Sequence, residues 1–291
     1  MHVELVRTVT RDGLRLDGAL SEARTAGDRA KPAATAAILL HGVASNFYTS
    51  NTFEPLIAKL PDLGLATLCV NTRGHDLVYG ASAGNIRRRF GAAYETVDDC
   101  RLDIAAWINF LKDRGHTRLV LIGHSLGAVK SIYAQAQDKF AEVAAVVAVS
   151  PPRLSYAAFM NAPESSQFWD SMHIAQQMAK VGQNDGLFTS TYPFPLLITA
   201  GAYIDKYGPA ERYNILNFVP ALPCPALFVY GGRELTTGGI AFAGLPDILN
   251  GLAGSESRSV AVIDGADHIY TATSERLATT VTDWLHSAVH V

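Results

Sequence analysis

The sequence has little cysteine, little excess charge and no long apolar run, and each shortage narrows the class of protein. Three cysteines in 291 residues cannot all pair, so we expect buried free thiols in a reducing compartment. A net charge of only −3 gives no electrostatic footprint for nucleic acid or an anionic membrane. No apolar run approaches the roughly 20 residues that span a bilayer, and residues 1–20 lack a signal-peptide core. We therefore expect a cytoplasmic protein with no membrane span and no nucleic-acid partner.

What the chain does have is enough apolar material for a large core. Hydrophobic residues make up 48% of the sequence, which argues against disorder. A length of 291 residues suits one large α/β domain with an insertion.

Apolar strands alternate with helical segments along most of the chain. The sequence begins with two strands joined at Asp12-Gly13, a strong hairpin turn signal, and a polar loop follows from Ser21 to Thr35. The expected later strands are 36–42, 65–74, 119–122, 143–152, 225–232 and 259–264, and the expected helices include 52–63, 94–115, 127–137 and 275–286. This alternation predicts a mostly parallel central sheet flanked by helices.

Regular alternation stops between the fourth and fifth of these later strands. Residues 152–222 contain helical fragments, of which SQFWDSMHIAQQMAKVG is the longest, and one short run, PLLITAG, that suits a strand. We interpret 152–222 as a mainly helical cap or lid, and 1–151 with 223–291 as the core that it interrupts.

The pentapeptide GHSLG, residues 123–127, places Ser125 at a sharp corner between an apolar strand and a helix. A corner this tight forces unusual backbone angles on the serine and leaves no room for a side chain at either flanking glycine. It raises the hydroxyl above the sheet, where a base can reach it. We therefore expect Ser125 to be a nucleophile.

A serine hydroxyl needs a positioned base, and the base needs an acid to orient it. Of the nine histidines, His268 alone lies in the loop after the last expected strand. Glu234 follows the penultimate strand, so the chain order is serine, acid, histidine. The rival acids are Asp247, Asp264 and Asp267.

The tetrahedral intermediate of acyl transfer also needs N–H donors. The backbone N–H of Leu126, directly after the serine, should supply one of them. The loop after strand 36–42 should supply the other, from Val43 or, as the runner-up, Ala44.

The motifs together resemble those of the α/β-hydrolase superfamily over nearly the whole chain. The matching pieces are HG at 41–42, NTRGHD at 71–76, GHSLG at 123–127, YGGRE at 230–234 and GADH at 265–268. The second piece usually reads D-x-R-G-x-G in that family, so Asn71 and Asp76 depart from it. The resemblance implies an α/β-hydrolase fold and a Ser125–His268–Glu234 hydrolase with no metal and no organic cofactor.

The nature of the nucleophile and of the presumed cap guides the choice of reaction. A serine at the elbow argues against dehalogenase and epoxide-hydrolase chemistry, which uses aspartate, and favours hydrolysis of a carboxylic ester of a small, largely apolar or aromatic substrate. Thioester, amide or carbon–carbon bond hydrolysis, acyl transfer and a non-catalytic binding role are the alternatives, and a homodimer is left open. The expected substrate-binding residues lie in the cap and are Phe168, Trp169, Met172, Phe188 and Tyr192.

Overall fold

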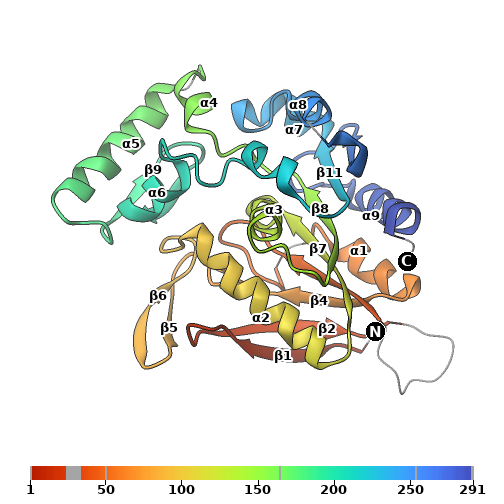
Figure 1. The fold of residues 1–291 in the computed structure, drawn as a ribbon. Coiled ribbons are helices and arrows are strands. Elements are labelled where there is room, and N and C mark those ends of the chain that lie inside the picture. The colour runs from red at the N-terminus through yellow and green to blue at the C-terminus, as the bar shows by residue number, and fades with distance from the viewer. Residues whose placement is uncertain (1, 24–33, 50, 164, 253, 290–291) are drawn as a thin grey trace.

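A single eight-stranded sheet organises the computed structural model, which describes residues 2–23, 34–49, 51–163, 165–252 and 254–289 (Figure 1). The strands follow the order β1-β2-β4-β3-β7-β8-β11-β12 across the sheet. Their bounds are β1 Glu4–Val9, β2 Arg15–Ser21, β3 Thr35–Leu40, β4 Ala66–Val70, β7 Arg118–His124, β8 Val143–Val149, β11 Ala226–Gly231 and β12 Arg258–Ile263. From β4 to β12 every neighbouring pair is parallel, as predicted, while β1 and β2 are antiparallel.

The N-terminal hairpin forms at the predicted turn. Gly13 has a φ of +84°, a value that glycine adopts without strain, and a Cβ there would lie 2.4 Å from the backbone nitrogen of Gly84. The hairpin extends the sheet because β2 pairs with β4. Most of the predicted loop from Ser21 to Thr35 lies outside the described residues.

Helices cover both faces of the sheet, and the central strands are apolar on both sides for this reason. In β7, Leu119 and Leu121 pack on the face covered by α2 (Cys100–Asp113) and α3 (Leu126–Asp138). Val120 and Ile122 pack on the opposite face, which α1 (Glu54–Lys59) and α9 (Ser274–Trp284) cover. A small helix, α8 (Leu245–Gly251), lies beside β12. No helix within the described ranges is long and apolar enough to cross a membrane.

A long segment, residues 156–221, is inserted between β8 and β11 (Figure 1). It contains α4 (Tyr156–Met160), α5 (Ser165–Lys180), β9 (Leu187–Ser190), β10 (Leu196–Thr199) and α6 (Ala200–Tyr207). The run PLLITAG does supply a strand, β10, but β10 pairs with β9 in a separate two-stranded sheet. We call residues 156–221 the inserted segment.

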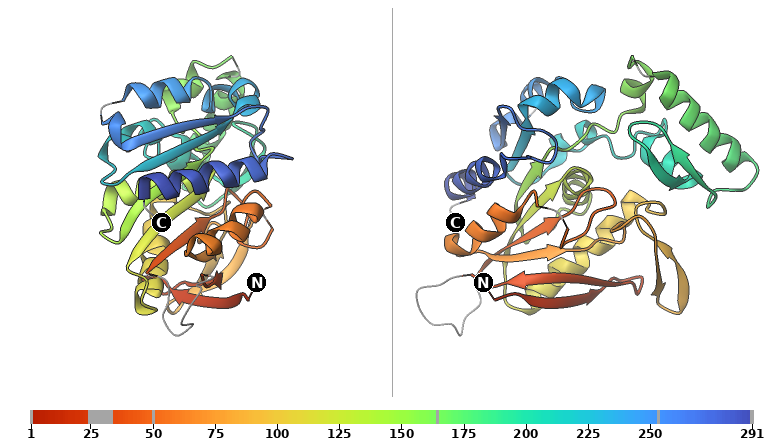
Figure 2. Two further views of the ribbon diagram at one scale, coloured as in Figure 1. Left: turned by 90° about the vertical axis from the view of Figure 1, so that its right-hand side faces the viewer. Right: turned by 180° about the vertical axis from the view of Figure 1, so that it is seen from behind.

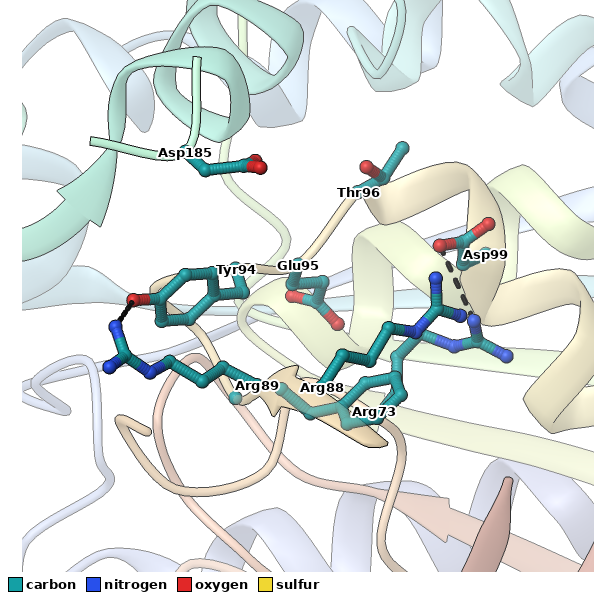
Figure 3. A pocket seen from close by; sticks show the side chains of 10 residues that line it. Arg73, Arg88, Arg89, Tyr94, Glu95, Thr96, Asp99 and Asp185 are labelled. Carbon is teal, nitrogen blue, oxygen red and sulfur yellow. Dashed lines mark hydrogen bonds and ion pairs between the residues drawn. The ribbon is translucent and has the colours of Figure 1, made fainter. Parts of the chain in front are cut away.

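A second hairpin, β5 (Tyr79–Ala83) with β6 (Ile86–Phe90), was not predicted from the sequence. Its strands carry glycine, alanine and three successive arginines, so they lack an apolar alternation. Figure 2 shows the hairpin and the inserted segment projecting on the same side of the sheet. A cavity of about 430 Å³ is lined by residues of both, including Arg88, Arg89 and Asp185 (Figure 3).

A buried ion cluster joins the inserted segment to the core at the wall of this cavity, which Glu95 lines. The Glu95 carboxylate lies 2.5 Å from Nζ of Lys130 on α3 and 4.0 Å from Nζ of Lys206 on α6. All three side chains are at most 1% exposed. Gly74 leaves the space for the carboxylate, because a Cβ there would lie 2.0 Å from a Glu95 oxygen.

Candidate active site

Ser125 occupies the corner between β7 and α3 that the sequence predicts. Its φ of 55° and ψ of −121° are unusual for a residue with a side chain. Both flanking glycines are required by space: a Cβ at Gly123 would lie 2.3 Å from the backbone of Gly127, and one at Gly127 would lie 2.4 Å from the carbonyl oxygen of Leu40. The corner therefore brings the start of α3 directly against the end of β3.

His268 and Glu234 lie next to this serine although they are far away in the sequence. The Ser125 hydroxyl is 3.0 Å from Nε2 of His268, and Nδ1 of the same ring contacts Oε1 of Glu234. Because a carboxylate can only accept, Nδ1 carries the proton and Nε2 is free to accept from the serine. Glu234 is buried at the first turn of α7 (Gly232–Thr237), and its second oxygen accepts from the N–H of Gly231 at 3.1 Å.

The rival carboxylates face elsewhere. Asp267 accepts from the N–H of Thr271 at 2.9 Å, although it precedes His268 directly in the sequence. Asp247 is an exposed residue of α8, and Asp264 is exposed at the end of β12. Glu234 is therefore the carboxylate that the fold brings to the imidazole.

A cavity of about 410 Å³ opens above the serine. Leu126 is the first residue of α3, directly after Ser125, and Val43 lines the wall of this cavity. The other lining residues come from the core. Five of them have polar side chains, Ser45, Thr49, Asn51, Thr52 and His124, and Ile269 is apolar.

The two departures from the family pattern, Asn71 and Asp76, both support the loop that carries Val43. The side-chain oxygen of Asn71 accepts from the N–H of Phe47 at 3.0 Å. Asp76 accepts from the side chain of Asn46 at 2.8 Å, and its own N–H donates to the Ser45 carbonyl at 3.0 Å. These bonds hold the loop from both ends of the NTRGHD motif.

Two further histidines near the site are kept neutral. Burial lowers the pKa of His41 to about 3 and that of His124 to about 4, with nearby Lys130 and His268 respectively adding to the effect. His124 donates from Nε2 to the carbonyl of His268 at 2.7 Å, and so fixes the backbone of the base. His41 donates from Nδ1 to the Gly42 carbonyl at 2.7 Å.

The structure places the five expected substrate-binding residues away from this wall. Phe168, Met172 and Tyr192 are buried inside the inserted segment, where Phe168 and Tyr192 meet each other and Phe159 edge to face. Phe188 packs against Tyr203 within the same segment, and Trp169 is 48% exposed on α5. Phe168, Met172 and Tyr192 thus belong to the core of the inserted segment, a role that periodicity alone does not separate from substrate contact.

Sequence reasoning missed Ser150, which follows β8 and donates to Oε2 of Glu234 at 2.7 Å. A polar residue directly after a fully buried strand, at the carboxyl edge of the sheet, was the available signal.

Comparisons with known proteins agree with the fold and the motifs. A 100-residue stretch is 39% identical to the 2-(acetamidomethylene)succinate hydrolase of Mesorhizobium japonicum, and it spans 34% of this chain and 30% of that protein. Among solved structures, the alpha/beta hydrolase GrgF of Penicillium sp. sh18 aligns over 100% of both chains with a TM-score of 0.70 and 16% identity.

A second solved structure is Est1E of Butyrivibrio proteoclasticus with bound ferulic acid. It aligns over 98% of this chain and 100% of its own with a TM-score of 0.66 and 17% identity. At such identities these structures show the fold alone. The sequence profile of the alpha/beta hydrolase family matches residues 37–281, and the chain belongs to that family of hydrolases.

Proposed function

We propose that this hydrolase cleaves a carboxylic ester of a small substrate through an acyl-enzyme formed on Ser125. The serine oxygen attacks the ester carbonyl while its proton passes to Nε2 of His268, and Glu234 stabilises the imidazolium that results. The N–H groups of Leu126 and Val43 stabilise the oxyanion. The imidazolium then protonates the leaving alcohol, and a water activated by the same nitrogen releases the acid.

One observation carries the proposal: hydroxyl, imidazole and carboxylate form an unbroken hydrogen-bonded line beside an open cavity. A serine kept only for the shape of the elbow would need neither the base at 3.0 Å nor the buried acid behind it. Binding alone requires no such line.

The cavity wall supports a substrate with hydrogen-bonding groups near the scissile bond. Ser45, Thr49, Asn51 and Thr52 line it beside the apolar Val43 and Ile269. We propose that the inserted segment acts as a cap over a core formed by residues 1–151 and 223–291. In that role it would bound the distal part of the substrate, and its aromatic core would keep it rigid.

Hydrolysis of a bond other than an ester is the second candidate, and the Mesorhizobium relative is the observation that favours it. That protein is a hydrolase of 2-(acetamidomethylene)succinate. Ser125 could attack such a substrate with His268 as the base, since cleavage of an amide or of a carbon–carbon bond next to a carbonyl can use the same nucleophile and base.

The test is release of nitrophenol from short p-nitrophenyl esters by the wild type and by Ser125→Ala, with 2-(acetamidomethylene)succinate assayed in parallel. We expect Ser125→Ala to lose at least about 10³-fold in kcat. Turnover of the succinate derivative at a higher kcat/KM than any ester would favour the second candidate.

Ser131→Ala is the matched control, because Ser131 is a buried serine of α3, the helix that begins directly after Ser125, and it donates to the Gly127 carbonyl at 2.9 Å. It should keep wild-type rates and should still be labelled by a fluorophosphonate. Equal rates for wild type and Ser125→Ala, or a label at another residue, would refute the proposed nucleophile.

A further inference from the structure

Each of four neighbouring strands is followed by a residue that belongs to one hydrogen-bonded chain. In the sheet order β7-β8-β11-β12, Ser125 follows β7, Ser150 follows β8, Glu234 follows β11 and His268 follows β12. The proposed mechanism uses the first, third and fourth of these residues. Ser150 is the member that it leaves without a role.

Proton bookkeeping fixes the direction of the bonds around Ser150. An ionised Glu234 can only accept, so the 2.7 Å bond is donated by the Ser150 hydroxyl. Because the only hydroxyl proton of Ser150 is used in that bond, the tyrosine must be the donor in the 3.0 Å hydrogen bond between Ser150 and Tyr270. The Tyr270 hydroxyl shares that proton with the Val229 carbonyl at 3.2 Å. The chain therefore runs from Tyr270 through Ser150 to Oε2, while Oε1 receives His268.

The backbone at both positions is strained in a way that a packing role does not require. Ser150 has a φ of +49° and Tyr270 a φ of +58°, values that residues with side chains rarely adopt. Their exposed fractions are 0% and 1%. Strained backbone of this kind persists where the surroundings over-determine it, and it concentrates at functional sites.

The length of the acid explains the need for such a clamp. Glutamate has one more rotatable bond than aspartate, so its carboxylate can swing away from the imidazole unless both oxygens are held. Oε2 receives two donors, the Ser150 hydroxyl and the Gly231 N–H, which leave Oε1 directed at the ring. We propose that Ser150, held by Tyr270, is a positioning residue that locks the Glu234 carboxylate toward His268. This inference rests on the proposed function of the triad.

The experiment compares Ser150→Ala and Ser150→Gly with the wild type. Both remove the hydroxyl, and the glycine variant also relieves the positive φ, so it protects the test against misfolding of the alanine variant. We expect kcat on p-nitrophenyl esters to fall about 10- to 100-fold, as for loss of a hydrogen bond to a charged group, with KM nearly unchanged. The kcat of Tyr270→Phe should fall about 2- to 10-fold.

A readout that does not depend on substrate is the downfield proton NMR resonance of the His268 Nδ1–H that contacts Glu234. It should shift or broaden in both Ser150 variants. Ser190→Ala is the matched control: Ser190 is a buried serine of the inserted segment that donates to a backbone carbonyl at 3.2 Å, and its loss should change neither kcat nor the resonance.

Folded Ser150 variants with kcat within about 2-fold of wild type and an unmoved resonance would overturn the inference. If the wild type hydrolyses no ester, the proposed function is refuted but the positioning role of Ser150 is not. The His268 Nδ1–H resonance then tests that role: a shift in the Ser150 variants supports it, and an unchanged resonance overturns it.

Discussion

Glu234 and Glu95 are both buried glutamates of the core, and their carboxylates are held in opposite ways. Glu234 is surrounded by directional hydrogen bonds from the Ser150 hydroxyl, the Gly231 N–H and the His268 ring. Glu95 is surrounded by two ammonium groups, one of which belongs to the inserted segment. The Nζ of Lys206 finds no hydrogen-bond acceptor among the described residues.

The two kinds of contact suit different roles for the two carboxylates. Hydrogen bonds with fixed directions orient a base to within a fraction of an ångström, whereas point charges attract over several ångströms without choosing an angle. Glu234 is thus suited to orient the imidazole that transfers the proton. Glu95 is suited to neutralise the ammonium groups that are buried between α3 and α6.

The largest expected effect comes from removing the charge at Glu234. Glu234→Gln should lower kcat about 10⁴-fold, because an amide in place of the acid favours the wrong imidazole tautomer. Unfolding by urea should show little change in stability. Asp247→Asn is the matched control and should keep the wild-type rate, since Asp247 is exposed on α8. The reverse ranking of these two variants would reassign the acid.

The equivalent change at Glu95 should act on stability. Glu95→Gln leaves two buried ammonium groups without a counter-charge, so we expect a loss of about 3–5 kcal/mol in the free energy of unfolding. Urea titration measures it. Glu4→Gln is the control: its ion pair with Arg114 is 47% exposed at the glutamate, and its loss should cost less than about 1 kcal/mol. Equal costs for the two variants would contradict the role given to the cluster.

Acid should destabilise the protein in the same way as Glu95→Gln, and reversibly, because protonation also removes the negative charge of Glu95. Burial raises the pKa of Glu95, but the ammonium groups of Lys130 and Lys206 outweigh it and hold the pKa below its usual range. The unfolded carboxyl therefore takes up its proton first as the pH falls. The stabilisation from Glu95 is complete above the usual pKa of a glutamate and is lost as the pH falls through the lowered pKa.

The smallest effect is expected at Lys206. Lys206→Met removes the ammonium group that lies farther from Glu95 and leaves a balanced pair with Lys130, so stability at neutral pH should change by no more than about 1 kcal/mol or should rise. Burial lowers the pKa of Lys206, so the wild type should gain stability as the pH rises toward the usual lysine range. The variant should lose that gain. If Lys206→Met lowered the free energy of unfolding as much as Glu95→Gln does, Glu95 would need both lysines, and the prediction would be wrong.

The parts of the molecule that the sequence predicts well are those that one buried strand and one turn determine. The strand before Ser125, its crowded glycines and the loop of His268 follow from local apolarity and from the backbone angles of a tight corner. The hairpin β5–β6 was missed because β5 consists largely of small residues and β6 carries three successive arginines, so neither strand shows an alternation of apolar and polar residues.

Contacts between side chains that lie far apart in the sequence were harder to predict. Phe168 and Met172 have the apolar character of a pocket wall, but their partners, such as Phe159, come from another helix of the inserted segment. Ser150 meets Glu234 across two neighbouring strands, and Glu95 meets Lys206 from the inserted segment. No period or spacing in the sequence encodes such pairings.

The strand order has a consequence for how the protein is made. Ser125 leaves the ribosome long before Glu234 and His268, and β12, which brings the base, is the last strand of the sheet to be synthesised. On the proposed mechanism, a chain that has not yet gained β12 carries a serine without its base. On that mechanism the hydroxyl becomes reactive only when β12 pairs with β11 at the edge of the sheet, so the docking of this strand is the step that activates the serine.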